Sequence, residues 1–244
     1  MTDKLKGKVA LITGASKGIG KGIARAFAGE GCSLVITSRS AEELQRAADE
    51  ATALGIEVVT HVADVADEKQ MQPAFDLATE RFGRLDILVN NAGAFNGGPI
   101  DEMSLEDWDR VIATNLRGPF LCTQMAFRIM KPQGGGRVIN IGSISGQRVR
   151  PRSSPYSTSK HGIWGLTQVT ALEGREHGIT CCCLHPGNIL TERRDASDKN
   201  EDEEPMIGVD DISEVALLMA TLGPNVEMLE AIVLPREQLY VGRG

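Results

Sequence analysis

The sequence of 244 residues is long enough to form one large α/β domain with a sizeable core. Hydrophobic residues make up 41% and charged residues 24%, a balance typical of soluble globular proteins. The net charge of -7 argues against general nucleic-acid binding, because no surplus of basic residues is available to replace counterions on phosphates. We therefore expect no nucleic-acid partner.

The first residues of the sequence do not have the pattern expected of a signal peptide or a membrane span. Residues 1–8 are polar and rich in lysine, and the apolar run that follows covers only residues 9–12. That run is too short for the core of a signal peptide or for a membrane span. We expect a soluble, cytoplasmic protein without a membrane partner.

The five cysteines do not form a disulfide or metal framework. Cys181, Cys182 and Cys183 are adjacent within an apolar run, which predicts a buried strand in which cysteine acts as a small hydrophobic residue. A metal site would require Cys-x-x-Cys spacing with a second pair elsewhere, and the sequence has none. We expect no bound metal.

Short apolar runs alternate with longer amphipathic stretches along the chain. The runs predict strands at residues 8–12, 33–37, 57–61, 85–89, 137–141, 179–184 and 231–234. The stretches predict helices near residues 19–29, 41–54, 68–82, 105–130, 156–177 and 211–222. This alternation indicates an α/β fold with a seven-stranded parallel sheet and helices on both faces, doubly wound because crossovers are right-handed. No linker divides the chain, so residues 1–244 are expected to form one domain.

A glycine-rich turn joins the first predicted strand to the first predicted helix. Its residues are Gly14, Ser16, Lys17, Gly18, Ile19 and Gly20. Glycines let the backbone turn tightly and approach a pyrophosphate, which the N-terminus of the following helix attracts. The strand–turn–helix context predicts a Rossmann dinucleotide site, with the spacing Gly-x-x-x-Gly-x-Gly.

Tyr156 and Lys160 lie four residues apart, which places both on one face of the predicted helix. A positive charge beside a phenol favours the phenolate, which suits proton transfer near neutral pH. Pro155 fits the first turn of this helix, and Ser153 or Ser154 could cap it. Our hypothesis is that Tyr156 acts as a general acid/base.

Asn115 lies inside the long predicted helix, four residues before Pro119. Proline has no amide hydrogen, so the carbonyl of Asn115 loses its helical partner and the helix should kink. A free carbonyl there could hold a water next to Lys160 and relay protons to Tyr156. The alternative is a kink without a functional role.

These motifs together resemble the short-chain dehydrogenase/reductase family over nearly the whole chain. The residues that carry the resemblance occur in family order: Thr13-Gly14-x-x-x-Gly18-Ile19-Gly20, Asp64, Asn90-Asn91-Ala92-Gly93, Asn115, Ser143, Tyr156-x-x-x-Lys160 and Pro186-Gly187. The resemblance implies the proton-relay role for Asn115, and a second contact of Lys160 with the nicotinamide ribose. It also implies that Ser143 holds the carbonyl oxygen. Ser145 is the rival, but Ser143 lies three residues before Gly146, as the family's serine does.

The resemblance also assigns cofactor contacts along the chain. Asp64 and Val65 would meet the adenine, Asn91, Ala92 and Gly93 would line the cofactor's path, and Pro186, Gly187, Ile189 and Thr191 would hold the nicotinamide end together with Tyr156 and Lys160. The second strand ends in Ser38-Arg39, where an acid would select NAD. Arginine instead forms strong hydrogen bonds with a 2′-phosphate, and Lys17 could add a second cation. The predicted cofactor is NADP.

We expect an NADP-dependent enzyme that interconverts a carbonyl and a secondary alcohol. The alternative within the family is a 3-oxoacyl-thioester reductase that acts on acyl-carrier-protein or CoA substrates, although the chain lacks the longer lid and the Gly-Gly ending of such enzymes. From another class, a non-catalytic dinucleotide-binding regulator would keep the fold without turnover. The complete catalytic set argues against the regulator, because binding alone does not require Ser143.

The substrate itself is not identified by the sequence. Candidate pocket residues are Phe95, Asn96, Gln147, Val149, His185 and Asn188, and the basic cluster Arg148, Arg150 and Arg152 could bind an acidic carrier protein or a charged substrate. The acidic segment 191–206 is expected to be either a mobile lid or a solvated loop. Apolar residues on more than one side of the helices at 105–130 and 156–177 predict a homodimer or homotetramer.

Overall fold

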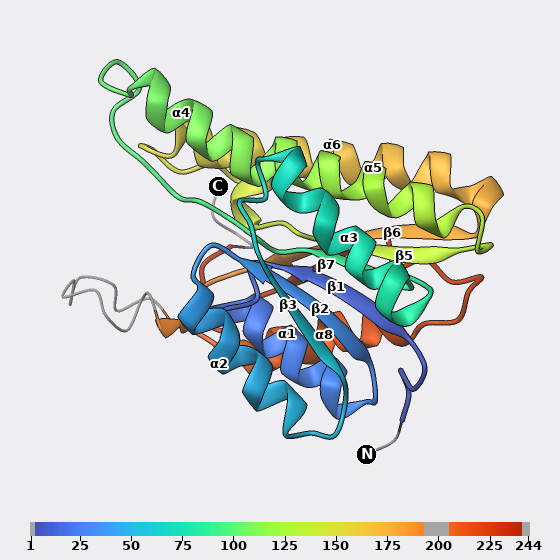
Figure 1. Ribbon diagram of the computed structural model, residues 1–244. Coiled ribbons are helices and arrows are strands. Elements are labelled where there is room, and N and C mark those ends of the chain that lie inside the picture. The colour runs from blue at the N-terminus through green and yellow to red at the C-terminus, as the bar shows by residue number, and fades with distance from the viewer. Residues whose placement is uncertain (1–2, 193–204, 241–244) are drawn as a thin grey trace.

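The computed structural model describes residues 3–192 and 205–240, and these form a seven-stranded parallel sheet in the order β3-β2-β1-β4-β5-β6-β7 (Figure 1). The strands are β1 (Val9–Thr13), β2 (Ser33–Ser38), β3 (Val58–Val62), β4 (Ile87–Asn90), β5 (Gly136–Ile141), β6 (Ile179–Pro186) and β7 (Glu230–Val233). Each lies within two residues of its predicted position. The predicted doubly wound α/β fold is confirmed.

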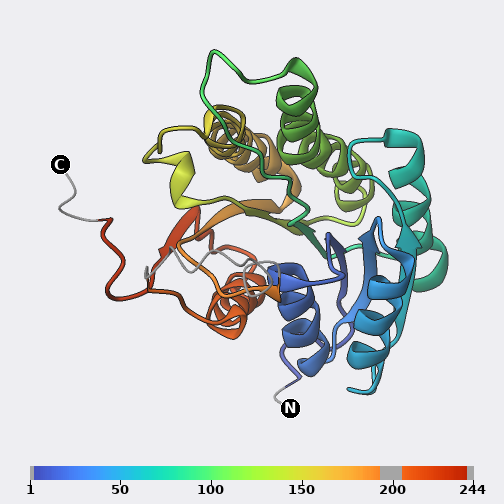
Figure 2. The same cartoon turned by 90° about the vertical axis from the view of Figure 1, so that its left-hand side faces the viewer.

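Helices cover both faces of the sheet, as Figure 2 shows along the sheet. One face carries α1 (Gly18–Gly29), α2 (Ala41–Thr52) and α8 (Val209–Thr221); the other carries α3 (Glu68–Phe82), α4 (Leu105–Ile112), α5 (Gly118–Met130) and α6 (Ser154–Gly174). Two separate buried clusters result, one around Ile23 and Phe27 of α1 and one around Met71 and Phe75 of α3. Every residue of β1 is buried, because a strand at the centre of such a sheet has no solvent face.

The predicted helix at 105–130 is interrupted at its middle. It begins at α4, where the Ser104 Oγ accepts a hydrogen bond from the Asp107 amide at 3.1 Å. A π-helical turn, η1 (Ala113–Arg117), separates α4 from α5. Because Pro119 cannot donate to the carbonyl of Asn115, the hydrogen-bond ladder shifts, and the Gly118 amide donates to the Ala113 carbonyl. The interruption takes the form of a π turn and leaves two helices where the sequence predicted one.

The start of α6 also differs from the expectation. Pro155 lies in the first turn as predicted, and Ser153 occupies the N-cap position. Its hydroxyl makes no cap hydrogen bond, however, because it donates to the carbonyl of Arg150 at 2.6 Å. Ser153 therefore fixes the turn before the helix, and neither serine caps α6 with its side chain.

The three adjacent cysteines lie on β6 and are buried, as predicted. Burial raises the pKa of the Cys182 thiol to about 12, which leaves it protonated and unreactive at neutral pH. Within residues 3–192 and 205–240 no cluster of three side chains suited to holding a metal ion occurs. Among those residues, too, every helix is too short or too polar to cross a bilayer.

The centre of the sheet determines where a ligand can bind. β1 pairs with β2 on one side and with β4 on the other. After β1 the chain turns to one face of the sheet, and after β4 it turns to the opposite face (Figure 2). In doubly wound sheets this divergence opens a crevice at the carboxyl ends of the strands.

Candidate active site

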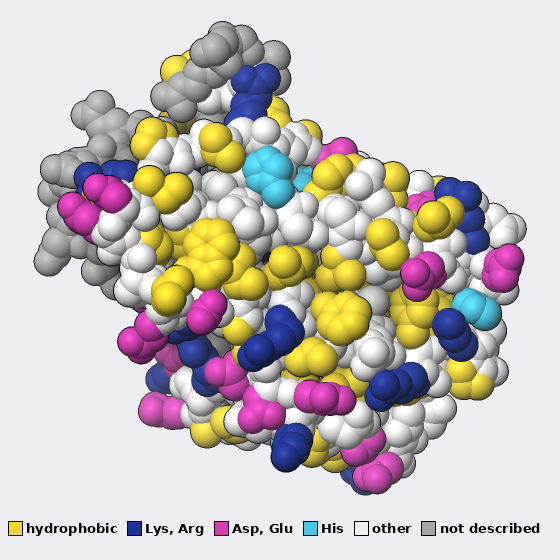
Figure 3. All heavy atoms as spheres, turned by 90° about the horizontal axis from the view of Figure 1, so that it is seen from above, with side chains coloured by type: hydrophobic (Ala, Val, Ile, Leu, Met, Phe, Trp, Pro, Cys, Tyr) yellow, Lys and Arg dark blue, Asp and Glu magenta, His cyan; other side chains and the backbone are white. Residues whose placement is uncertain are grey.

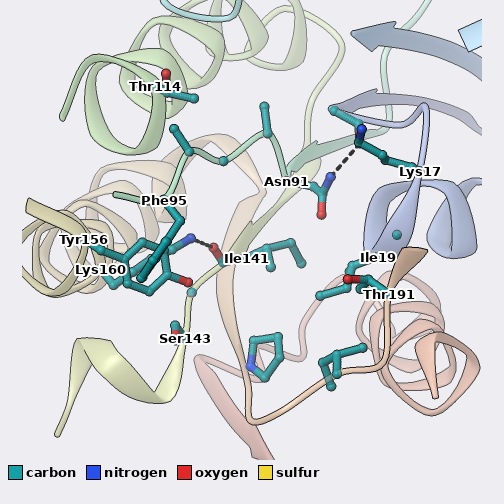
Figure 4. Close-up of a pocket in the computed structure, with 18 of the residues that line it drawn as sticks. Lys17, Ile19, Asn91, Phe95, Thr114, Ile141, Ser143, Tyr156, Lys160 and Thr191 are labelled. Carbon is teal, nitrogen blue, oxygen red and sulfur yellow. Dashed lines mark hydrogen bonds between the residues drawn. The ribbon is translucent and has the colours of Figure 1, made fainter. Parts of the chain in front are cut away.

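A cavity of about 1050 Å³ lies at the carboxyl ends of the strands. Figure 4 shows Tyr156, Lys160, Phe95 and Ser143 at one side of it and Lys17, Ile19, Asn91 and Thr191 at the other. Of the residues predicted from the sequence, those that line the cavity are Gly14, Ser16, Lys17, Gly18, Ile19, Ser38, Arg39, Asp64, Val65, Asn91, Ala92, Gly93, Ser143, Tyr156, Lys160, Pro186, Gly187, Ile189 and Thr191. Gly20 and Asn115 do not line it.

The glycine turn is shaped by its contact with the segment after β4. Gly14 has a φ of 65°, and a Cβ built there would lie 2.7 Å from the Cα of Ala92. A Cβ on Gly20 would lie 2.3 Å from the Asn91 side-chain nitrogen. That nitrogen donates to the carbonyls of Thr13 and Gly14, at 2.9 and 3.0 Å. Gly20 therefore serves the cavity by allowing Asn91 to fix the turn, and not by lining it.

The N-terminus of α1 holds an anionic side chain of the protein itself. The Gly18 amide donates to the Glu192 Oε2 at 2.9 Å, and Thr191, the preceding residue, lies against Gly18. Helix N-termini favour anions because their amides are unpaired and the helix dipole is positive there. No local sequence pattern predicts this contact, because it joins residues far apart in the chain.

Cations gather where the cavity passes the end of β2. Arg39 lines the cavity and is exposed, and within the described ranges it forms no ion pair. Lys17 lies 3.6 Å from the Glu43 carboxylate, which also lines the cavity. The two cations predicted to bind one phosphate therefore differ in their partners, since Lys17 already forms an ion pair with an acid.

Asp64 and Val65 follow β3 at the edge of the cavity, as predicted. The Asp64 Oδ1 accepts a hydrogen bond from the Ala66 amide at 2.9 Å, and the backbone amide of Asp64 donates to the Gln70 side-chain oxygen. Val65 is buried against Gly118 at the start of α5. These contacts hold the residues after β3 rigidly beside the cavity.

Lys160 is 6% exposed, and its side chain runs beside the ring of Tyr156 with its nitrogen directed toward Ile141 (Figure 4). Its Nζ lies 5.7 Å from the centre of the Tyr156 ring and donates to the Ile141 carbonyl at 2.8 Å. This buried ammonium is thus held by a backbone carbonyl at the end of β5. The side chain of Ile141 does not mark it as this partner, because the contact involves its main chain.

Ser143 stands at the end of β5, on the side of the cavity that carries Tyr156 (Figure 4). Its Oγ accepts from the Ser145 amide at 3.1 Å, which fixes the side chain at the start of the turn. Ser145 is buried and does not line the cavity. The position of the two serines therefore favours Ser143 over its rival.

Asn115 lies behind the cavity wall and is 1% exposed. Its side chain accepts from the Ala94 amide at 2.7 Å and donates to the Ala94 carbonyl at 2.8 Å and to the Ser159 Oγ at 3.1 Å. These bonds join the π turn to the segment after β4 and to α6. Asn115 therefore supports the walls that carry Tyr156, while the relay through its carbonyl stays a prediction.

His185 is a buried polar residue next to Ser143, and it does not line the cavity. Its Nδ1 lies 2.9 Å from the Ser143 carbonyl, and its Nε2 lies 3.4 Å from the Glu230 carboxylate. Burial holds the pKa of His185 below its ordinary value, although the Ser143 carbonyl and Glu230 oppose that effect. Gln147 donates to the same carboxylate and accepts from the Tyr240 hydroxyl. Of these two residues, which we predicted in the pocket, His185 instead contacts Ser143 through its Nδ1, and Gln147 joins β7 to the segment after it.

The wall beside Tyr156 contains one aromatic residue predicted from the sequence. Phe95 packs edge-on against Tyr156, with ring centres 5.2 Å apart. Asn188 also lines the cavity, and Val149 lines a smaller adjoining one, whereas Asn96 lines neither. The predicted lid at 191–206 lies mostly outside the described residues.

The residues present fit a nicotinamide dinucleotide. The glycine turn, the N-terminus of α1 and the backbone after β3, β4 and β6 line one continuous cavity. The Glu192 carboxylate already accepts from the Gly18 amide, which shows that this helix start binds an anion. Tyr156 and Lys160 lie at the end where the carbonyl chemistry would take place.

A profile of the short chain dehydrogenase family matches residues 8–202. The chain is 38% identical to D-beta-hydroxybutyrate dehydrogenase of Cupriavidus necator, over 77% of this chain and 72% of the relative. It is 37% identical to 3-oxoacyl-[acyl-carrier-protein] reductase of Synechocystis, over 83% of this chain and 81% of that relative.

A short chain dehydrogenase of Burkholderia cenocepacia, solved in complex with NADP, is 33% identical and superposes with a TM-score of 0.86 over 95% of this chain and 98% of that one. With this fold, this cavity and this profile match, the chain belongs to the short-chain dehydrogenase family of oxidoreductases, whose members bind a nicotinamide dinucleotide.

Proposed function

We propose that the protein is an NADP-dependent oxidoreductase that interconverts a carbonyl and a secondary alcohol. The observation that carries this proposal is the placement of Tyr156, Lys160 and Ser143 around one end of a cavity whose other end is the glycine turn. Proton transfer and carbonyl binding are the tasks for which those three side chains are suited.

In the proposed mechanism, the bound nicotinamide supplies the hydride to the carbonyl carbon, and the protein supplies the remaining functions. Ser143 donates a hydrogen bond to the carbonyl oxygen and holds it beside the phenol. Tyr156 gives its proton to that oxygen as negative charge develops, and recovers it when the reaction runs as an oxidation. Lys160, held by the Ile141 carbonyl at 2.8 Å, keeps a positive charge next to the phenol throughout.

The removal of the Tyr156 hydroxyl tests this mechanism. Tyr156→Phe keeps the ring that packs against Phe95 and removes the proton donor, so we expect kcat with a ketone to fall by at least about a hundredfold. Absorbance of NADPH measures turnover, and fluorescence titration of NADPH should give a Kd close to that of the unchanged protein. Turnover that survives in Tyr156→Phe would rule out the proposed role.

A second candidate is a 3-oxoacyl-thioester reductase, which the similarity to the Synechocystis enzyme favours. Acetoacetyl-CoA and simple ketones in the same assay separate the two candidates. A protein that binds NADPH but reduces neither would instead be the non-catalytic dinucleotide-binding regulator.

A further inference from the structure

Past Tyr156, the large cavity adjoins a smaller one of about 430 Å³. Arg150, Arg152 and Ser153 line both cavities. The smaller cavity is otherwise lined by Gly98, Ile100, Val149, Ser154, Ser157, Thr158 and His161. The two cavities together leave room for a substrate to extend from Tyr156 past the turn that carries the two arginines.

This end of the cavity is positively charged, although the protein as a whole carries a net charge of -7. Neither Arg150 nor Arg152 forms an ion pair with any residue in the described ranges, and no acidic residue in those ranges lines the smaller cavity. The acids of the large cavity lie toward the dinucleotide end, where Glu43 pairs with Lys17 and Glu192 binds the Gly18 amide. Arg150 and Arg152 therefore bring two positive charges, without an acidic partner in the described ranges, to the substrate side of the cavity.

The turn that carries the arginines is held in place from both sides. The Ser153 Oγ donates to the Arg150 carbonyl at 2.6 Å and lies 2.7 Å from the Ser157 Oγ. Arg152 has a φ of 60°, in the left-handed region that side chains other than glycine rarely adopt. Gly97 packs so closely that a Cβ there would lie 2.2 Å from the Arg152 carbonyl. A strained conformation imposed by its surroundings is a recurrent feature of binding sites.

We propose that the carbonyl substrate carries a carboxylate or phosphate group, which Arg150 and Arg152 bind while Ser143 and Tyr156 hold its carbonyl. This inference rests on the proposed function and names its substrate class. A guanidinium matches the geometry of both anions and forms paired, charge-assisted hydrogen bonds with them. Phe95, which lines the same end beside Tyr156, offers contact to the apolar part of such a substrate.

Matched pairs of substrates, with and without the anion, test the proposal. Acetoacetate, levulinate and benzoylformate are each compared with their methyl esters, and dihydroxyacetone phosphate with dihydroxyacetone, by NADPH absorbance. We expect kcat/KM for at least one anion to exceed that of its neutral partner about tenfold or more. The pair of compounds that shows this preference identifies the group on the substrate as a carboxylate or a phosphate.

Variants of the arginines locate the effect. Arg150→Ala and Arg152→Ala should each lower the ratio of anion to neutral kcat/KM about tenfold, through a higher KM for the anion. Arg152→Lys keeps the charge and should retain part of the ratio. The matched control is Arg148→Ala, because Arg148 lies 5.0 Å over the ring of Tyr240 and lines neither cavity. The control should keep the ratio of the unchanged protein.

Equal use of anions and neutral partners, or a ratio that survives in the arginine variants, would overturn the proposal and leave the reductase function intact. If no compound is reduced, the proposed function fails, and calorimetric titration of the same compounds in the presence of NADP+ still tests the anion site. The site is supported if an anion binds and if Arg150→Ala and Arg152→Ala abolish that binding. It is refuted if the anion and its neutral partner bind equally well, or if no anion binds.

Discussion

At the scale of single residues, Arg39 and Lys17 line the same cavity, and Lys17 also lies beside the Glu43 carboxylate. The sequence placed both beside the dinucleotide, and both line the cavity. It could not show that Lys17 lies 3.6 Å from Glu43, because the ion pair joins the glycine turn to α2. A local motif indicates the type of residue at a position, whereas the ion-pair partner of that residue depends on residues far away in the sequence.

We expect the protein to prefer NADPH, and Arg39 to be responsible. Arg39→Ala removes a cation that forms no ion pair with the described residues, so KM for NADPH should rise about tenfold or more while KM for NADH changes little. Glu43→Gln should lower KM for NADPH, because it frees Lys17 and removes a charge that repels the 2′-phosphate. Initial rates with both cofactors measure these effects. A lower KM for NADH than for NADPH in the unchanged protein would contradict the NADP assignment.

At the scale of elements, hydrophobic periodicity was sufficient to predict the strands. The exception among the helices was 105–130, where one amphipathic pattern runs through α4, the π turn and α5. A helical pattern indicates which residues are helical but not the step of their hydrogen bonds, so the pattern does not distinguish a π turn from the α-helix around it. Pro119 was the one local signal, and it predicted that the helix is disturbed but not how.

Asp86 joins two central strands just before β4 begins. Its carboxylate accepts from the Val9 amide at 3.0 Å, from Lys8 at 3.0 Å and from Arg84 at 2.6 and 2.7 Å. Burial alone would raise the pKa of Asp86, but the hydrogen bonds from Arg84, Lys8 and the Val9 amide together hold it below its usual value. The charged form is therefore the form that stabilises the fold.

The lowered pKa determines how stability depends on pH. The contribution of Asp86 is fully present above its unfolded pKa near 4 and is lost as pH falls through the lower, folded value. Asp86→Asn should lower the free energy of unfolding at pH 7 by about 1–3 kcal/mol, and the difference from the unchanged protein should shrink below about pH 4. Urea denaturation at pH 7 and pH 3.5 measures this. Asp109→Asn, on an exposed position of α4, is the control. A difference independent of pH would show that the charge is not the cause.

At the scale of the whole molecule, the outer surface of α5 and α6 is unusually apolar. Phe120 is 49% exposed on α5, and Val169 and Leu172 on α6 are 52% and 62% exposed. Figure 3 looks onto this face, where hydrophobic side chains gather in the middle among charged ones. An exposed apolar patch with a polar rim is typical of a protein interface.

We therefore expect a homodimer or homotetramer that uses this face. Phe120→Glu combined with Val169→Glu places charges within the patch and should give a smaller assembly in sedimentation velocity, because charge is costly in a buried interface. Leu218→Glu, at a similarly exposed position on α8 on the opposite face, should leave the assembly unchanged. A monomer in the unchanged protein at micromolar concentration would contradict the expectation.

The contact between Glu192 and the Gly18 amide makes cofactor binding an exchange of one anion for another. On the proposed binding mode, the pyrophosphate approaches the amide that Glu192 now holds at 2.9 Å, and only one of them can accept its hydrogen bond. Thermodynamic linkage then requires reciprocity: a dinucleotide that displaces Glu192 weakens its hold on α1, and any partner that draws Glu192 away tightens the dinucleotide by the same factor. The position of Glu192 and the occupancy of the cofactor site therefore depend on the same equilibrium.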